Sequence, residues 1–157
     1  MQNALTVIVR IKPDRMRFLE ETLEIIGKDI NGNHEILAQR NELLDFNAIS
    51  TVHFCRFVLL PNEDTGNFDH LLFTSNYDGT LQDHLNEFLD KAGDAMDTIW
   101  GCCEGYPLGV REKAPEQFRI AFREFIEAHS HDFNAFYIGY RGKSGNAIRR
   151  NARIRAQ

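Results

Sequence analysis

The sequence lacks the features that would assign a location directly. No stretch approaches the roughly 20 consecutive apolar residues that a membrane-spanning helix needs. The first residues, MQNALTVIVRIKP, contain neither the basic region nor the small-residue cleavage site of a secretory signal. We therefore expect no membrane association and no secretion.

Cysteine is scarce, with three residues and no C-x-x-C pair. An odd count without a paired framework favours a reducing compartment, so the predicted location is the cytoplasm. Cys102 and Cys103 are adjacent, and two neighbouring thiolates do not readily occupy two corners of a tetrahedral zinc site. The preferred interpretation is that they are buried as small hydrophobic residues, with a reactive thiol as the alternative. No metal site is predicted.

Short catalytic motifs are also missing. The chain has no G-x-S-x-G, P-loop, H-E-x-x-H or G-x-G-x-x-G, so hydrolase, nucleotide-binding and zinc-protease functions lose support. His129 and His131 form an H-x-H that could chelate only with a third ligand. At a helix end they more simply favour its negative pole.

Charge is unevenly distributed along the 157 residues, a length that suits one domain. The net charge is −5, and residues 141–157 carry six Arg and Lys and no acid, so the first 140 residues sum to −11 (−5 less +6). An acidic body repels phosphate backbones, which argues against nucleic-acid binding. The predicted organisation is a domain over 1–142 and a basic tail over 143–157 that docks on the acidic body or on a partner chain.

Hydrophobic periodicity predicts four strands and several helices. Leu5, Val7, Val9 and Ile11 alternate with other residues as in a strand, and Thr80 with Asp83 resembles a helix-capping pair. The expected strands are 4–12, 50–61, 68–76 and 133–142, with a hairpin loop at 62–67. Helices are expected from Pro13, from Thr80, over 95–103 and from Pro115, and 34–49 is expected to be a partly irregular covering segment.

The element order indicates an α+β protein with a ferredoxin-like βαββαβ antiparallel sheet, helices on one face and extra helices. The strands are apolar at both alternations, and 50–61 is expected to be buried on both faces. Leaving one sheet face in water would expose several large side chains. The sequence therefore predicts a homodimer in which two chains pack sheet to sheet.

Three stretches, VHFCRFVLL, LLFTSNYDGTLQDHL and DTIWGCCEGYP, carry a family resemblance. Together they resemble a ferredoxin-like, dimeric α/β-barrel family whose members also form the leading part of longer haem-peroxidase-like proteins. The resemblance spans most of 4–142. It implies the barrel-like dimer and a cavity between sheet and helices, and it makes haem a possible cofactor. The matching positions are His53, Phe54 and Arg56; Ser75, Asn76, Asp78 and Gly79; and Cys103, Glu104, Gly105, Tyr106 and Pro107.

The candidate ligand-pocket residues come from these matches: His53, Arg56, Asn76, Asp78, Cys103, Glu104 and Tyr106. Each also has a structural interpretation. Asn76 and Asp78 suit turns and helix caps, and Glu104 suits hydrogen bonding within its loop. His53 and Arg56 lie three apart, so a regular strand points them to opposite faces, and a buried Arg56 would need a carboxylate such as Glu104 or Asp78.

Three functions follow from these observations. The first is a homodimeric module that binds a small apolar or aromatic ligand in the predicted cavity. The second is a haem- or oxygen-dependent oxidoreductase, or an accessory domain of one, with His53 as a possible axial ligand. The third is a purely structural or interaction module. No catalytic residue is assigned.

Overall fold

The structure of the chain is a computed structural model that describes residues 2–30 and 44–132. Its elements are β1 (Gln2–Arg10), η1 (Pro13–Arg15), α1 (Met16–Ile30), η2 (Phe46–Ala48), β2 (Val52–Pro61), β3 (Phe68–Asp78), α2 (Leu81–Trp100) and α3 (Pro115–Ala128). The predicted α+β class is confirmed. The expected last strand, 133–142, the basic tail, 143–157, and most of the covering segment lie outside the described residues.

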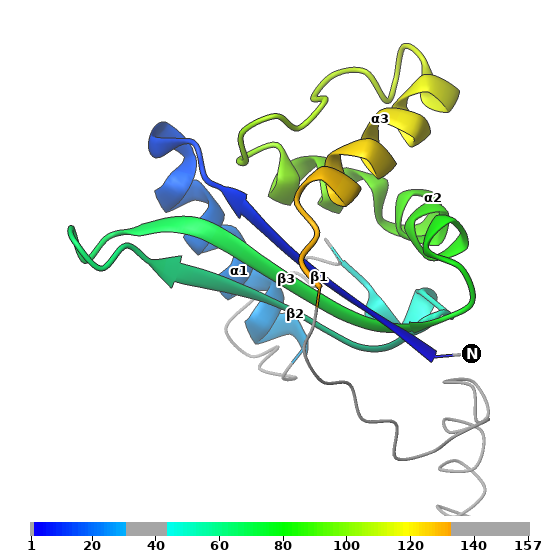
Figure 1. Cartoon of the computed structure of the whole chain (residues 1–157), viewed down its shortest axis with the longest axis horizontal. Helices are drawn as coiled ribbons and strands as arrows, with labels where there is room; N and C mark the ends of the chain where they lie inside the picture. Colours follow the sequence, from blue (N-terminus) through cyan, green and yellow to red (C-terminus); the bar gives the residue numbers. More distant parts are fainter. Residues whose placement is uncertain (1, 31–43, 133–157) are drawn as a thin grey trace, which may run out of the picture.

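The three described strands form one antiparallel sheet in the order β1-β3-β2 (Figure 1). β3 pairs with both neighbours, and the central rung joins Val7, Phe73 and Phe57. The predicted loop between β2 and β3 is confirmed as a hairpin, closed by a 2.7 Å bond from the Asn62 N–H to the Asn67 carbonyl.

One face of this sheet forms the wall of the core. Alternate side chains point to this face because successive residues of a strand alternate between its two sides. The core face is formed by Leu5, Val7 and Val9 of β1, by Leu71, Phe73, Ser75 and Tyr77 of β3, and by Val52, Cys55, Phe57 and Leu59 of β2.

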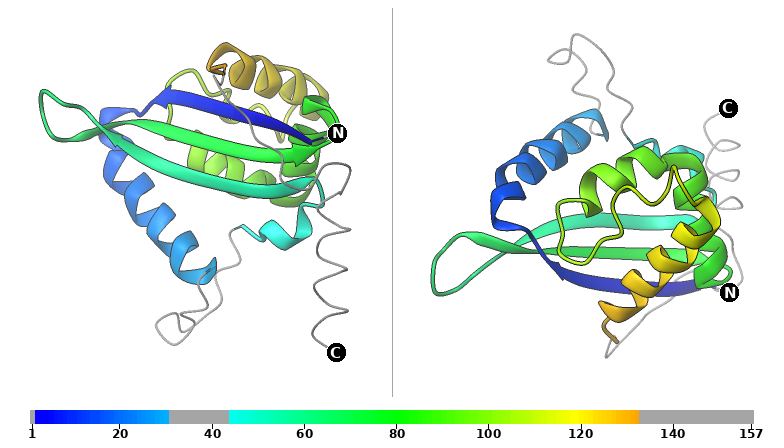
Figure 2. Two further views of the ribbon diagram at one scale, coloured as in Figure 1. Left: turned by 60° about the horizontal axis from the view of Figure 1, so that its bottom comes forward. Right: turned by 90° about the horizontal axis from the view of Figure 1, so that it is seen from above.

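The helices cover that face. α2 and α3 lie on the same side of the sheet, with α3 over β1, as both views of Figure 2 show. α1 contacts α2 and adds Leu19 and Ile26 to the same core. The helical turns expected over 95–103 are found for 95–100, which form the second part of α2 after a bend at Ala92, a residue with non-helical φ −143° and ψ 29°. Residues 101–103 lie beyond the end of α2.

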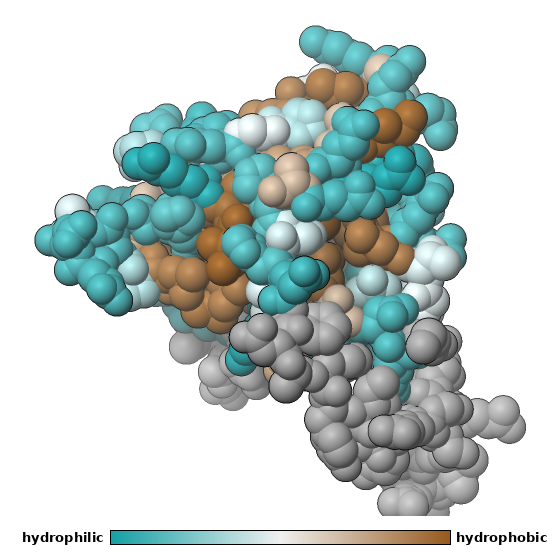
Figure 3. All heavy atoms as spheres, in the orientation of Figure 1, coloured by the Kyte–Doolittle hydropathy of each residue, from teal (hydrophilic) through white to brown (hydrophobic). Residues whose placement is uncertain are grey.

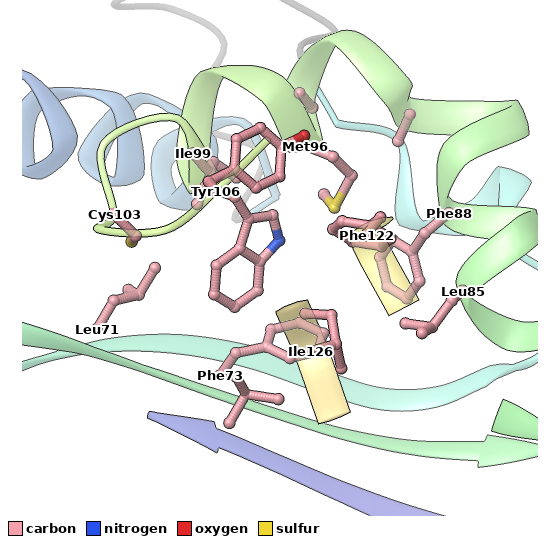
Figure 4. Close-up of a cluster of buried hydrophobic side chains, with 14 of the residues drawn as sticks. Leu71, Phe73, Leu85, Phe88, Met96, Ile99, Cys103, Tyr106, Phe122 and Ile126 are labelled. Atoms are coloured by element: carbon pink, nitrogen blue, oxygen red, sulfur yellow. The ribbon is translucent and has the colours of Figure 1, made fainter. Parts of the chain in front are cut away.

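Aromatic side chains fill the space between the sheet and the helices (Figure 4). Trp100 of α2 packs edge-on against Phe73, with ring centroids 5.6 Å apart, and against Phe125 of α3 at 5.8 Å. Phe88 meets Phe73 from the other half of α2 at 6.0 Å. Such offset and edge-to-face pairs stabilise a core beyond the burial of their area.

The opposite face of the sheet, termed the open face, contains Ala4, Thr6, Ile8, Leu72, Thr74, Asn76, Phe54, Arg56, Val58 and Leu60. Phe54 retains 57% of its surface exposed. Among the described residues, the helices cover one face of β2, and the expected burial of its other face against a second chain stays a prediction. In Figure 3 a group of apolar atoms lies over the strands beside the hydrophilic hairpin tip.

Two residues of α3 test which side of that helix supports the fold. Phe122 is 1% exposed and Ile120 is 52% exposed. Phe122→Ala should lower the free energy of unfolding by about 3–5 kcal/mol, because it leaves a cavity in a packed core. Ile120→Ala should change it by less than about 0.5 kcal/mol. Urea unfolding measures both variants, and equal losses would contradict the described packing.

Candidate functional site

The structure divides the seven candidate pocket residues into two groups. His53, Arg56, Asn76 and Asp78 belong to β2 and β3, and the last three of them follow the pleat of the open face. Cys103, Glu104 and Tyr106 lie in the loop after α2, on the helical side of the sheet. The expected convergence of all seven on one cavity between sheet and helices is therefore not what the structure describes.

His53 is paired with Asp78 across the ends of β2 and β3. The register shifts between Val52 and Phe54, so His53 lies at a bulge where regular alternation stops. Its Nε2 is 2.9 Å from the Asp78 Oδ2, and the side chains are 13% and 23% exposed. The bulge removes the basis for expecting His53 and Arg56 on opposite faces, because the His53 ring reaches a carboxylate on the side of Arg56.

Arg56 and Asn76 occupy the open face as strand residues. Arg56 is exposed and its Nε donates a 3.2 Å hydrogen bond to the Thr74 hydroxyl, so it does not need the carboxylate expected for a buried arginine. Asn76 lies opposite Phe54 and Ala4. The expected capping role falls instead to Thr80, whose hydroxyl accepts from the Asp83 N–H at 3.1 Å.

The adjacent cysteines are packing residues, as the preferred interpretation predicted. Cys102 is 2% exposed and Cys103 is fully buried. Cys103 forms a β-bridge with Ile11, while the Lys12 N–H donates to the Cys102 carbonyl at 2.9 Å. Burial raises the pKa of Cys103 to about 12, so the neutral thiol dominates at physiological pH.

Tyr106 and Glu104 hold the loop to its neighbours. The Tyr106 hydroxyl donates a 2.6 Å hydrogen bond to Asp97 of α2, which also accepts from Arg111 at 2.7 Å. Between them, Gly105 adopts φ +80°, a backbone conformation that favours glycine. The Glu104 carboxylate is half exposed, 3.9 Å from the Arg10 guanidinium.

A buried polar network that the sequence analysis did not single out joins α2 to β3 and to the residues just before β2. His84 is 0% exposed, with Nδ1 2.8 Å from the Thr51 hydroxyl and Nε2 3.0 Å from the Ser75 hydroxyl. Its ring stacks on Tyr77 with centroids 4.2 Å apart. His84 lies one turn before Phe88 on the apolar stripe of α2, and that spacing was the signal available in the sequence.

Glu87, about two turns after the Thr80 cap on the same helix, closes this network just before β2. Its carboxylate accepts from the backbone and hydroxyl of Ser50 at 2.7 and 2.6 Å, and from the Thr51 N–H at 2.9 Å. Burial alone would raise the pKa of Glu87, but these hydrogen bonds outweigh it and lower the pKa to about 2. Burial lowers the pKa of His84 to about 4, although Glu87 opposes that shift. The arrangement is therefore a neutral imidazole clamped between two hydroxyls.

Surface grooves of the described residues include three that bear on the candidate residues or the helices. The first, of about 200 Å³, lies between α1 and β2 and is lined by Leu23, Ile26, Gly27, Phe46, Cys55, Arg56 and Phe57. The second, of about 600 Å³, lies between the start of α1 and the β2–β3 hairpin, and the third, of about 180 Å³, lies between α2 and α3. Arg56 is the one candidate pocket residue that lines any of the three.

The residues present do not favour a haem bound through His53. The Nε2 of that ring lies 2.9 Å from the Asp78 Oδ2, so an axial bond through this nitrogen would require the two side chains to separate. Within residues 2–30 and 44–132, no three His, Cys, Asp or Glu side chains are grouped to hold a metal ion.

Comparisons with models of protein families, with curated proteins and with solved structures gave no match. The family resemblance noted from the sequence therefore stays a prediction. Among the helices of the described residues, none combines the length and apolar character needed to cross a membrane.

The His84 network predicts loss of stability in mild acid. The pKa of His84 is about 4 in the fold and 6.5 in its absence, so the unfolded chain binds the extra proton. The stabilisation is complete above pH 6.5 and falls by about 3 kcal/mol as the pH drops to about 4. Urea unfolding at steps between pH 7.5 and 4 measures this dependence.

His84→Gln is the matched variant, because it keeps hydrogen-bonding groups and removes the titration. Its free energy of unfolding should vary less over the same pH range, by about the 3 kcal/mol assigned to His84. An unchanged slope in this variant would assign the acid sensitivity to other groups.

Proposed function

We propose that the chain acts in the cytoplasm as a ferredoxin-like homodimer whose two open faces pack together and enclose a small apolar or aromatic ligand. The single observation that carries the proposal is the open face itself, which is mainly apolar and has a polar cluster, His53, Asp78, Arg56 and Asn76, at one end. A water-exposed sheet face of this kind is typical of an interface.

The ferredoxin-like arrangement is supported at the outer edge of β1. As the chain leaves α3, the Ile8 N–H donates to the His129 carbonyl at 3.1 Å and the His131 N–H donates to the Thr6 carbonyl at 2.9 Å. Val7 and Ser130 thus form an antiparallel bridge. A fourth strand placed beside β1 would give the strand order of the split βαβ unit.

A second copy is the occupant that the charge distribution favours. The first 140 residues of each chain sum to −11, so two copies repel one another over most of their surfaces. At the end of β3 that adjoins the open face, the Asp78 carboxylate lies 2.9 Å from His53, and the ten residues that define the open face contain no acid. Two such faces can approach without juxtaposing unpaired carboxylates, and a symmetric dimer needs a self-complementary surface of this type.

The ligand is proposed to lie between the two faces, where apolar side chains surround a few directional groups. Phe54 and Val58 of β2 with Leu72 of β3 provide the apolar wall. The Asn76 amide and the Arg56 guanidinium provide hydrogen-bonding groups beside them. The loop of Cys103, Glu104 and Tyr106 takes no part in this refined location, because it packs on the other side of the sheet.

The dimer is tested by placing a charge on the open face. Phe54→Asp should weaken dimerisation at least about 100-fold, roughly 3 kcal/mol, because the carboxylate would be buried without a partner. Sedimentation equilibrium at several protein concentrations measures the dissociation constant. Phe18→Asp is the control, since Phe18 of α1 is 47% exposed and lies outside the open face. A monomeric wild-type chain, or equal effects of both variants, would overturn the proposal.

The ligand site is tested with an uncharged aromatic probe, N-phenyl-1-naphthylamine. Its fluorescence should rise and saturate with the wild-type dimer, and the response should be lost in Phe54→Asp and kept in Phe18→Asp. Binding that persists in the monomeric variant would place the probe away from the paired faces. A dimer that binds no probe would separate dimerisation from ligand binding and leave the interaction module as the function.

A further inference from the structure

The groove between α2 and α3 contains an arginine whose charge is not matched. Arg123 lines this groove of about 180 Å³ together with Gln82, Leu85, Asn86, Glu116, Arg119 and Ile120. Its Nη1 donates a 3.4 Å hydrogen bond to the Gln82 side-chain oxygen. Its Nε is buried and lacks a hydrogen-bond partner among the described residues.

Arg119, one turn earlier on α3, shows what a satisfied arginine in the same groove looks like. Its Nη2 donates to Asp90 at 2.5 Å and its Nη1 donates to Asn86 at 3.3 Å. Glu116 lies 4.0 Å from its Nε. Arg123 has no such carboxylate within ion-pair distance in the part of the chain that the structure describes, although it belongs to an acidic body.

A half-buried guanidinium that has no carboxylate partner in the described ranges, and whose Nε is buried there without an acceptor, favours an incoming anion. Burying a donor without a partner costs free energy, and a carboxylate that accepts from two guanidinium nitrogens recovers that cost with a fixed geometry. Glu116 does not block this approach, because its side chain is 87% exposed and its charge is screened by solvent.

The remainder of the groove indicates the rest of the ligand. Leu85 is buried in the groove and Ile120 is 52% exposed at its side, so an apolar group would cover surface that is otherwise wet. The volume is below the roughly 300–1,000 Å³ of pockets for drug-sized molecules, which restricts the ligand to a small one. The side-chain oxygens of Gln82 and Asn86 accept from the arginines and keep both guanidinium groups in the groove.

We propose that the α2–α3 groove binds a small organic carboxylate, with Arg123 holding the carboxylate and Leu85 and Ile120 contacting its apolar body. The groove is built from the outer side of the helical layer, whereas the open face lies across the sheet (Figure 2). This site is thus independent of the ligand site proposed between two chains.

Benzoate tests the proposal, with benzamide as its uncharged analogue and acetate as an anion without the apolar body. Titrations of the full chain are followed by ¹H–¹⁵N correlation spectra that include the arginine Nε–H signals. Benzoate should saturate and shift the Arg123 signal, while benzamide and acetate should each bind at least tenfold more weakly. Equal binding of benzamide would overturn the role of charge, and equal binding of acetate would overturn the role of the apolar contact.

Arg123→Gln should weaken benzoate binding at least tenfold. Arg123→Lys should weaken it less, because lysine keeps the positive charge but not the paired N–H donors of the guanidinium. Arg17→Gln is the control, since Arg17 of α1 is exposed and paired with Glu21. If Arg123→Gln fails to fold, the Arg123→Lys and benzamide comparisons still decide the proposal. Unchanged benzoate affinity in both Arg123 variants would overturn it. Binding of the naphthylamine probe should be unaffected by Arg123→Gln. The two proposed sites can therefore be refuted independently of one another.

Discussion

The antiparallel pairing of β3 with both of its neighbours is the constraint on which the described fold depends. Because β3 is central, its alternate side chains determine what lies on each side of the molecule. Phe73 and Tyr77 direct the packing of α2, and Ser75 receives the buried His84 ring. Leu72 and Asn76 point the other way, to the open face.

The two sides of the sheet consequently use polar groups differently. On the helical side, polar side chains are held by neighbours in the same chain, as in the Glu87–Thr51–His84–Ser75 network. Buried groups satisfied in this way specify one packing arrangement. On the open face, Arg56 donates to a strand hydroxyl and keeps much of its surface in solvent. The first side is organised for stability, and the second keeps groups available for contact.

The sequence predicts the elements well where periodicity alone determines them. The first three strands, the hairpin and the Thr80 cap were all recoverable, because alternation and capping chemistry are local. The break expected between the helix from Thr80 and the helical turns over 95–103 is a bend at Ala92 within α2, and its exact position depends on tertiary packing. The candidate site was grouped by a resemblance between short stretches, and proximity in sequence does not say on which side of a sheet a loop lies. The bulge at His53 and the lack of a carboxylate partner for Arg123 among the described residues depend on tertiary packing, which no local sequence pattern contains.

The β-bridge between Ile11 and Cys103 has a consequence for the chemistry of the thiols. Both Cys102 and Cys103 are enclosed by the end of β1 and the loop after α2, and the chain elsewhere offers Cys55, which is half buried. Cys103 is fully buried in this arrangement, so a small alkylating reagent reaches its thiol when this packing opens. The rate at which Cys103 is modified therefore reports how often this edge of the sheet opens locally.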